Sequence, residues 1–327
     1  MKQFHPTEIL FVPTTQCNLR CGHCGVRQGR ARLSPTVAIR FLRACRGKGV
    51  ERIGFTGGEP FLAPGFLNRV TRAAVRQGFL FGRLMTNGVW FANRKILESR
   101  LQALHTAGFD GGLCVSVDAF HRQELRKVAA FVRTAVQIWN RSDVVSIAAA
   151  FGARDAETQR KLARLAQLLR ARLVRLGRGG FLIRSETAWI RVTPIPLVPL
   201  GAAARWKKPW GGRWFRDDYC QGPGHVFVVD PDGAVKPCCG YANELPELTL
   251  GSSHANTFSE LMRHARRDPL LAAIFERGLQ PIRRALEKAG WRFPGKTTSH
   301  CFFCHYLLTE VPRPLLLRHI KAVLGPR

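Results

Sequence analysis

The sequence predicts an α/β fold in which parallel strands, each followed by a helix, form a partial (β/α)6 barrel. Between residue 9 and about residue 196, short β-branched or apolar runs alternate with helical patterns, which is typical of successive βα units. Six such units are too few for a closed barrel of eight strands. The runs that predict the six strands begin at Ile9, Arg52, Phe81, Leu113, Val144 and Phe181.

Residues that favour helix ends stand between these runs. Ser34 is expected as an N-cap with Pro35 at the first helical position, and Asn93 as the N-cap of a helix that Gly108 closes. The helix before the sixth strand carries an apolar stripe, which we expect to pack against the barrel. The stripe consists of Leu162, Leu165, Leu169 and Leu173.

The chain changes character near residue 200. We expect residues 1–200 to form the barrel, and residues 201–327 to form a linker and a smaller extension. The linker, from Gly201 to about Asp217, is rich in Trp, Gly, Lys and Arg, which favours irregular structure.

The extension has its own pattern of elements. The stretch "HVFVVDPDGAVKPC" predicts a hairpin that turns at Asp232 and Gly233. Helical patterns follow from about Thr257 to Gly278 and from Pro281 to Gly290, and then comes "CFFC". The expected extension is therefore a hairpin with helices.

The chain is strongly basic. Its 327 residues include 51 Lys and Arg against 22 Asp and Glu, a formal net charge of +29, and only eleven of the basic residues are lysines. This surplus indicates either a field that attracts an acidic peptide or a nucleic acid, or a solvated basic surface without a partner. The composition leaves both interpretations open.

No stretch approaches the ~20 apolar residues of a membrane span, and "MKQFHPTEILFV" does not resemble a signal peptide. We therefore expect a cytoplasmic protein. In a reducing compartment, ten cysteines indicate metal ligands, reactive thiols or core residues rather than disulfides. Cys45 and Cys114, in a helical pattern and an apolar run, are expected in the core.

Three cysteines lie directly after the first strand, where parallel barrels carry their active-site loops. In "CNLRCGHC" they are Cys17, Cys21 and Cys24. Three thiolates can hold three corners of a [4Fe–4S] cube and leave the fourth iron open to substrate. A zinc site is the alternative, but such sites usually close with a fourth ligand, and only His23 is near.

This cysteine loop, together with "FTGGEP" after the second strand, resembles the radical S-adenosylmethionine (SAM) enzymes. The resemblance implies a [4Fe–4S] cluster, bound SAM, and a loop that receives the methionine amino group. That loop would be Gly57, Gly58, Glu59 and Pro60. The implied chemistry is reductive cleavage of SAM to a 5′-deoxyadenosyl radical, which abstracts an unactivated hydrogen.

Softer correspondences lie after the third strand and on the fourth, in "LMTNGVW" and "CVSVDAFH". The resemblance implies that Asn87, Ser116 and Asp118 contact the ribose and carboxylate of SAM, although each could instead be a strand-end cap or turn residue. His23 occupies a position where the family often has an aromatic residue near the adenine.

Five further cysteines lie in the C-terminal part, and their arrangement resembles the auxiliary-cluster extension of radical enzymes that modify peptides. The resemblance implies a second [4Fe–4S] cluster, while a zinc ribbon is the alternative. The implied ligands are Cys220, Cys238, Cys301 and Cys304. One thiol, at Cys239, is left over.

Together, the hairpin ending in "PCC", the late Cys-x₂-Cys and the barrel motifs are similar to radical peptide epimerases of the YydG type. The resemblance implies an enzyme that converts L-residues of a ribosomally made peptide to D-residues, with Cys239 returning hydrogen as the catalytic thiol. Adjacent side chains of an extended chain point in opposite directions, so Cys238 and Cys239 would face different ways. The alternatives are that Cys239 ligates and Cys238 is spare, or that the spare thiol is merely packed.

The implied partners are a ribosomally synthesised precursor peptide and an external electron donor, with no membrane. Rival functions are a maturase that forms a thioether or carbon–carbon crosslink, a nucleic-acid-modifying radical enzyme, and a non-catalytic zinc-binding adaptor. No RNA-binding module with interleaved aromatic residues is visible, which disfavours nucleic acid. About eight residues precede the first strand, so we expect leader recognition by the barrel mouth, the C-terminal part or a separate protein.

Overall fold

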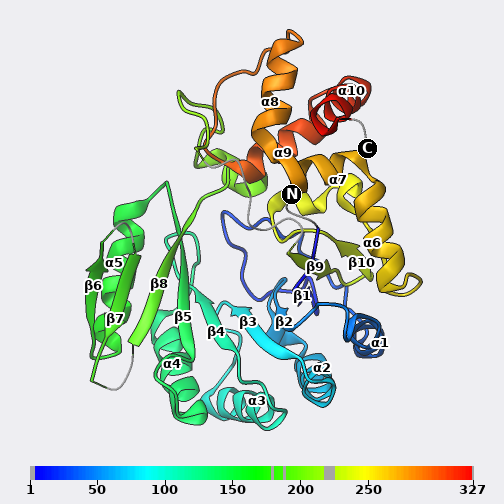
Figure 1. The fold of residues 1–327 in the computed structure, drawn as a ribbon. Helices are drawn as coiled ribbons and strands as arrows, with labels where there is room; N and C mark the ends of the chain where they lie inside the picture. Colours follow the sequence, from blue (N-terminus) through cyan, green and yellow to red (C-terminus); the bar gives the residue numbers. More distant parts are fainter. Residues whose placement is uncertain (1–3, 178–179, 187–188, 217–224, 326–327) are drawn as a thin grey trace.

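A mixed, mostly parallel sheet organises the molecule (Figure 1). Its order is β11-β10-β9-β1-β2-β3-β4-β5-β8-β7-β6. The computed structural model describes residues 4–177, 180–186, 189–216 and 225–325. None of the helices in these ranges is long and apolar enough to cross a membrane.

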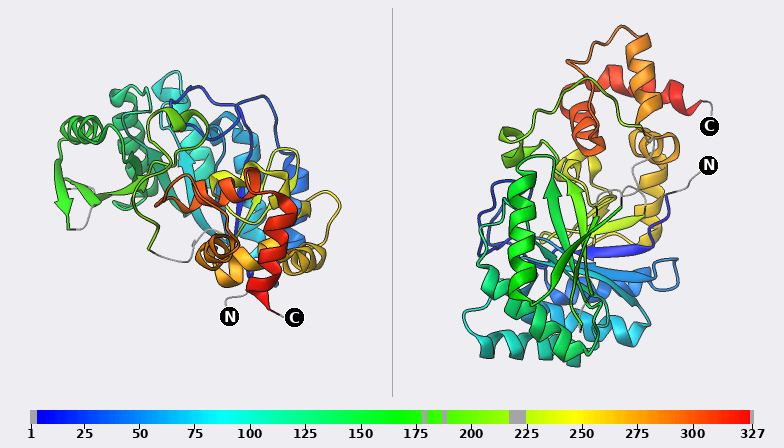
Figure 2. Two further views of the ribbon diagram at one scale, coloured as in Figure 1. Left: turned by 90° about the horizontal axis from the view of Figure 1, so that it is seen from above. Right: turned by 90° about the vertical axis from the view of Figure 1, so that its left-hand side faces the viewer.

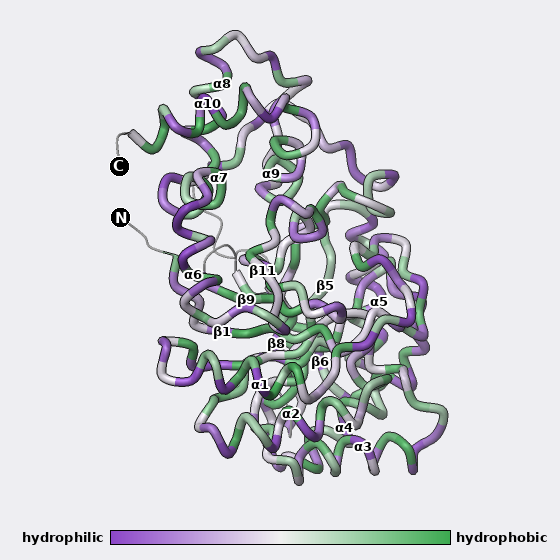
Figure 3. The backbone as a smooth tube through the Cα atoms, turned by 90° about the vertical axis from the view of Figure 1, so that its right-hand side faces the viewer, coloured by the Kyte–Doolittle hydropathy of each residue, from purple (hydrophilic) through white to green (hydrophobic). Residues whose placement is uncertain are grey.

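Six strands of the barrel part pair in parallel. They are β1 (Glu8–Phe11), β2 (Arg52–Phe55), β3 (Leu80–Thr86), β4 (Gly112–Ser116), β5 (Val145–Phe151) and β8 (Trp189–Pro196). The helices between them are α1 (Pro35–Cys45), α2 (Pro64–Gln77), α3 (Arg94–Thr106), α4 (Leu125–Trp139) and α5 (Asp155–Leu168). Figure 3 shows hydrophobic stretches along the central strands and on parts of the helices around them.

The helix boundaries follow the sequence closely. Pro35 opens α1 after Ser34, whose side chain makes no capping hydrogen bond. The Asn93 side chain accepts a hydrogen bond from the Ile96 N–H at 3.0 Å, and Gly108 takes a left-handed φ of +96° just beyond α3. Cys45 and Cys114 are buried in the core, as expected.

The strand expected at Phe181 forms, but its expected parallel direction is wrong. Phe181 lies in β7 (Gly180–Arg184), which is the middle strand of an antiparallel meander that begins with β6 (Arg172–Leu176) and ends with β8. Of the three meander strands, β8 is the one that pairs in parallel with β5. The apolar runs of β7 and β8 look alike in sequence, and strand direction depends on which neighbour each one meets.

The apolar stripe before that strand is also shorter than expected. Leu162 and Leu165 are buried within α5, but the helix ends at Leu168. Leu169 is its C-cap, and Leu173 belongs to β6. The stripe therefore combines a helix face with part of the following strand, because apolar spacing alone does not reveal where a helix stops.

The expected hairpin forms and joins the main sheet. β9 (Val226–Val229) pairs in parallel with β1 and antiparallel with β10 (Ala234–Lys236), and Gly233 takes a left-handed φ of +86° in the turn. A short β11 (Gly251–Ser252) follows. The hairpin is thus an outer part of the barrel sheet, because its first strand hydrogen-bonds to β1.

The C-terminal helices gather at the hairpin side of the sheet, away from the β6–β7 edge (Figures 1 and 2). They are α6 (Phe258–Arg267), α7 (Pro269–Ala272), α8 (Leu279–Lys288), α9 (His300–Thr309) and α10 (Arg313–Leu324), with a π-helical turn at Ala273–Arg277. The linker holds one short helix, η2 (Gly201–Arg205).

One hydrophobic core runs from the barrel into these helices. Phe227 of β9 is fully buried, with its ring centroid 6.1 Å from that of Phe41 in α1 and 5.9 Å from that of Phe258 in α6. The division at residue 200 stays a prediction, but the two stretches share a sheet and a core.

Phe227→Ala should lower the free energy of unfolding by about 3–5 kcal/mol, because it removes a buried ring at the junction of these helices. The shared core predicts one cooperative transition in urea, followed anaerobically by circular dichroism on the iron-loaded protein. Leu80→Ala, at a strand residue 54% exposed, is the control and should change stability by no more than about 0.5 kcal/mol. Two separate transitions would contradict the shared core.

Candidate functional site

Cys17, Cys21 and Cys24 lie together in the half-buried loop after β1. The Cys24 N–H donates to the Cys21 carbonyl at 3.3 Å, which makes a tight turn. Burial, then the neighbouring Cys24 and Cys17, raises the pKa of Cys21 to about 12. Three thiols this close together favour a bound positively charged group, because such a group stabilises their thiolate forms. Soft sulfur ligands of this kind select an iron–sulfur cluster or zinc. The donor set therefore fits the expected cluster.

The loop after β2 lies directly against the segment before Cys17. The N–H groups of Gly58 and Glu59 donate to the carbonyls of Thr14 and Gln16 at 3.0 and 2.8 Å. A Cβ on Gly58 would come within 2.3 Å of the Gln16 oxygen, and Gly57 has a φ of +126°. The two glycines are required because no side chain fits between these backbones.

Glu59 ties this loop to the end of β3. Its fully buried carboxylate accepts hydrogen bonds from the Phe61 N–H (3.1 Å), the Thr86 hydroxyl (2.9 Å) and the Asn87 N–H (2.7 Å). Burial raises the pKa of Glu59 to about 7 against the effect of these donors. Pro60 opens the 3₁₀ turn that follows. The side chain of Glu59 thus organises the loops, and a contact with cofactor stays a prediction.

Asn87 joins the end of β3 to the cysteine loop. Its side-chain amide donates to the Asn18 oxygen at 2.8 Å and to the Cys17 sulfur at 3.7 Å. Gln123, which the sequence analysis missed, donates to the carbonyls of Asn87 and Ser116 at 2.5 and 2.7 Å. Gln123 therefore holds the ends of β3 and β4 side by side.

Asp118 is a buried hydrogen-bond acceptor just after β4. Its Oδ1 accepts from the His121 ring at 2.8 Å and its Oδ2 accepts from the Ala150 N–H at 3.1 Å. Burial acts to raise the pKa of Asp118, but the hydrogen bond and charge of His121, with smaller effects of His23 and Ala150, lower it to about 2. The carboxylate is therefore ionised at neutral pH.

His23 faces this carboxylate from the cysteine loop, with its Nε2 atom 3.9 Å from Asp118 Oδ2. Its ring centroid lies 4.8 Å from that of His121 and 4.9 Å from that of Phe120. Burial lowers the pKa of His23 to about 4, so the ring is neutral near pH 7. The sequence analysis missed His121, although it follows Asp118 in "DAFH".

In the C-terminal part, Cys238 follows β10, and α9 carries Cys301 and Cys304. A Cβ on Gly240 would lie 3.0 Å from the Cys301 sulfur and 3.7 Å from that of Cys238. Burial raises the pKa of Cys238, with further effects from Cys304, Cys239 and Cys301. The structure thus gathers these cysteines from two distant segments.

The adjacent pair differs in exposure: Cys238 is buried and Cys239 is exposed. Cys220, the fourth expected ligand of this group, lies outside the described residues. Three of the four expected ligands can therefore be placed.

Tyr241 links the two cysteine groups. Its hydroxyl donates to the His23 carbonyl at 3.5 Å, and its ring lies where a Cβ on Gly25 would be, 2.1 Å from Cε1. Burial raises the pKa of Tyr241 to about 12, with further effects from Cys24 and Cys301. The sequence analysis missed this residue, although it stands two positions after the cysteine pair.

A mostly parallel sheet, with three thiols after its first strand and a glycine loop after its second, brings together residues that could hold a thiolate-ligated group at its strand ends. Residues 11–140 match the profile of the Radical SAM superfamily. The chain therefore contains a radical SAM domain.

Relatives divide by how much of the chain they match. The probable GTP 3′,8-cyclase of Methanopyrus kandleri is 36% identical over 118 residues, and the match covers 35% of this chain and 35% of that relative. The chain therefore spans about a third of that relative's length. The putative peptide biosynthesis protein YydG of Bacillus subtilis is 21% identical over 319 residues and covers 91% of each chain. The native structure of anSMEcpe with bound AdoMet and Cp18Cys peptide has a TM-score of 0.50 at 15% identity, covers 78% of this chain and 80% of that one, and shows the fold.

At pH 4.5, Glu59→Gln should destabilise the protein by about 1–3 kcal/mol, because one buried backbone N–H loses its acceptor to the new amide. Burial raises the folded-state pKa of Glu59 to about 7 from 4.5. The protonated carboxyl therefore contributes fully to the free energy of unfolding below pH 4.5, and this contribution is lost as the pH rises to 7. The wild-type advantage over the variant should therefore shrink across that window, by up to about 1.4 kcal/mol for each pH unit. A constant difference in urea-unfolding free energy between pH 4.5 and 7 would contradict this assignment.

Gly25→Ala should displace Tyr241 from the cysteine loop, because the new Cβ overlaps its ring. We expect lower iron retention after anaerobic gel filtration. Gly65→Ala, at a glycine of α2 with nothing within 4 Å of its Cβ, is the control. Combining Gly25→Ala with Tyr241→Ala should restore iron retention in part, and an unchanged iron content in Gly25→Ala would sink the idea.

Proposed function

We propose that this chain is a radical SAM enzyme that modifies a ribosomally synthesised peptide by converting L-residues to D-residues. The observation that carries the proposal is the exposed thiol of Cys239 beside the buried Cys238, in a segment that Tyr241 ties to the first cysteine loop. The full-length similarity to YydG supports the peptide class of substrate.

Two [4Fe–4S] clusters and SAM are the proposed cofactors. Cys17, Cys21 and Cys24 would hold the first cluster, and Cys238, Cys301 and Cys304, with Cys220, would hold the second. SAM would lie against the glycine loop and the strand ends. The residues proposed to line it are Gly57, Gly58, Glu59, Pro60, Asn87, Ser116, Asp118 and His23. When bound, the first cluster and SAM supply abstraction of a hydrogen atom from an unactivated carbon.

The residues of the chain then have separate tasks. The Gly57–Glu59 loop and Asn87 hold the cysteine loop in place through the hydrogen bonds described above. Neutral His23 and the ionised Asp118 provide a polar wall near pH 7. This arrangement orients groups at the strand ends.

Cys239 would return the hydrogen. Once a hydrogen atom has left the α-carbon, the S–H bond of Cys239 breaks and a C–H bond forms on the opposite face, which inverts the residue. A thiyl radical remains, and one electron from an external low-potential reductant, with one proton from solvent, restores the thiol. A thiol serves this step better than a metal-bound thiolate, because only the thiol carries the hydrogen.

Cys239→Ala should keep the iron content of the wild type and still form 5′-deoxyadenosine with dithionite, but it should yield no D-residue, because hydrogen abstraction precedes the thiol step. The assays are iron and sulfide content, 5′-deoxyadenosine by liquid chromatography, and chiral amino-acid analysis of a co-expressed precursor peptide. Cys239→Ser should behave as Cys239→Ala, since an O–H bond is too strong to donate the hydrogen atom.

Cys238→Ala is the matched control and should lose iron. Iron loss in both Cys239 variants would make Cys239 a ligand, and a normal yield of D-residue in either would remove its role. A peptide product lighter by two hydrogens would indicate crosslinking in place of epimerisation, and bound zinc without iron would indicate the adaptor.

A further inference from the structure

A basic cavity of about 370 Å³ lies between the linker and the segment that leads into α9. Four of its lining residues are cationic, and none is acidic. The lining consists of Pro199, residues 207–213 and residues 296–299, with the charges on Lys207, Lys208, Arg213 and Lys296. This open cavity therefore gathers positive charge from two segments of the chain.

The walls of this cavity are held by backbone and aromatic contacts. Gly211 and Lys296 exchange two backbone hydrogen bonds, at 2.6 and 2.9 Å. The Trp210 ring packs edge-on against Phe302 and Tyr306 of α9, with centroid distances of 5.0 and 4.8 Å. The cavity is thus preorganised, which lowers the entropy cost of binding.

The basic groups of this cavity lack acidic partners within the described residues. None of the ion pairs found there involves Lys208, Arg213 or Lys296, which are exposed. Lys207 donates to the Leu197 carbonyl at 3.1 Å. The ten-residue α9 also begins here, after its N-cap Ser299, and its N-terminus adds positive potential. An anion in the cavity would relieve this concentration of charge.

The lining residues of the cavity are neighbours in the chain of the barrel's last strand, of α9 and of a contact to the first cysteine loop. Pro199 lies just beyond β8, and Ser299 precedes Cys301 by two positions in α9. Next to Lys207 in the chain, Trp206 donates from its ring N–H to the Gly22 carbonyl in the first cysteine loop at 3.0 Å. The segment that lines the cavity therefore continues into a residue that contacts the first cysteine loop.

We propose that this cavity binds the carboxylate side chains of an acidic segment of the peptide substrate. The proposal rests on the peptide-modifying function and adds where the peptide is held. A carboxylate segment fits better than a nucleic acid, because the Trp210 ring is already packed against α9 and is unsuited to stack on a base.

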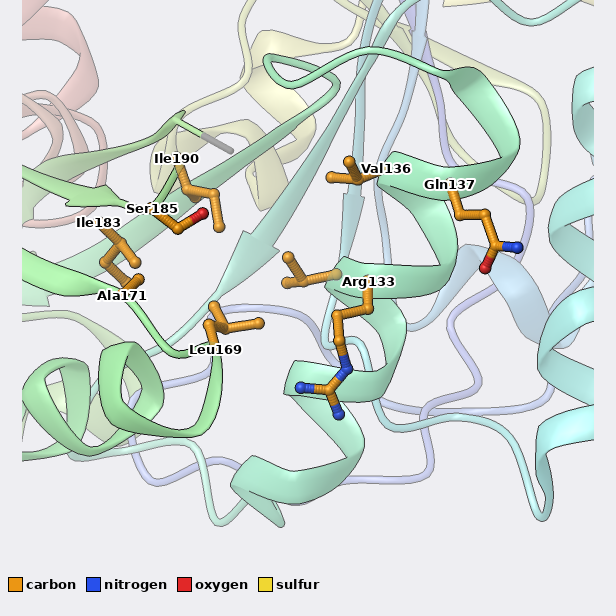
Figure 4. Close-up of a pocket in the computed structure, with 9 residues that line it drawn as sticks. Arg133, Val136, Gln137, Leu169, Ala171, Ile183, Ser185 and Ile190 are labelled. Atoms are coloured by element: carbon orange, nitrogen blue, oxygen red, sulfur yellow. The ribbon is translucent and has the colours of Figure 1, made fainter. Parts of the chain in front are cut away.

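A second cavity, of about 230 Å³, lies between α4 and the meander (Figure 4). Its lining is mostly apolar, and Arg133 is its one charged residue. Nothing in the described residues indicates an occupant for this apolar cavity.

The test measures binding directly, by fluorescence anisotropy of a short labelled peptide of alternating Glu and Gly. The iron-loaded triple variant K208E/R213E/K296E should bind this peptide at least about tenfold more weakly than wild type, because three favourable charges become unfavourable. The same peptide with Gln in place of Glu should bind neither protein. Raising salt from 0.1 to 1 M should weaken wild-type binding, since the Debye length falls from ~10 to ~3 Å.

The matched control is R69E/R72E/R76E, which makes the same change in net charge on the exposed face of α2. It should bind the Glu peptide within about twofold of wild type. Iron content and thermal midpoint verify that both triple variants are folded.

Equal losses in the two triple variants would indicate a diffuse field and overturn the cavity proposal, as would full binding by the cavity variant. Tighter binding of a labelled single-stranded RNA, lost in the cavity variant alone, would assign the cavity to nucleic acid. Absence of D-residue in wild-type products would instead overturn the proposed function, and the binding result would stand on its own.

Discussion

The close contact between the glycine loop and the backbone before Cys17 is the constraint on which the rest of the site depends. Two hydrogen bonds from Gly58 and Glu59 join the ends of β1 and β2, and the absence of side chains at Gly57 and Gly58 permits the approach. The Glu59 carboxylate then accepts a hydrogen bond from the Asn87 N–H at the end of β3. The Asn87 side chain in turn donates to the Cys17 sulfur. The position of the cysteine loop is therefore set by three strand ends at once.

The C-terminal part is built into this arrangement rather than attached to it. β9 adds to β1 in parallel, and Phe227 packs between helices from both parts of the chain. Tyr241 lies on the cysteine loop, which brings the Cys238–Cys239 segment beside the strand ends. The buried and exposed members of the cysteine pair can therefore serve different purposes within one short segment.

Charge and burial act separately in this protein. Inside the site, burial is the largest influence on the pKa of Glu59, His23 and the cysteines, and local donors set the ionised state of Asp118. The basic surplus instead lies largely on exposed side chains, and at the mouth of the cavity beside α9 it meets no acidic partner within the described residues. The reaction centre and the proposed peptide site thus use different physical effects.

Local signals in the sequence determined the parallel strands up to β5, the caps at Ser34 and Asn93, the hairpin turn and the cysteine groups, because each depends on residues close in the chain. Prediction failed where neighbours are distant. The sequence could not show that β7 runs antiparallel, or that Gln123 and Tyr241 join the site, whereas His121 lies only three positions after Asp118 and was within reach of a local pattern. Strand direction, the burial of one cysteine beside an exposed one, and the contact of Tyr241 with Gly25 were decided only by tertiary packing, which brings together segments that no spacing rule relates.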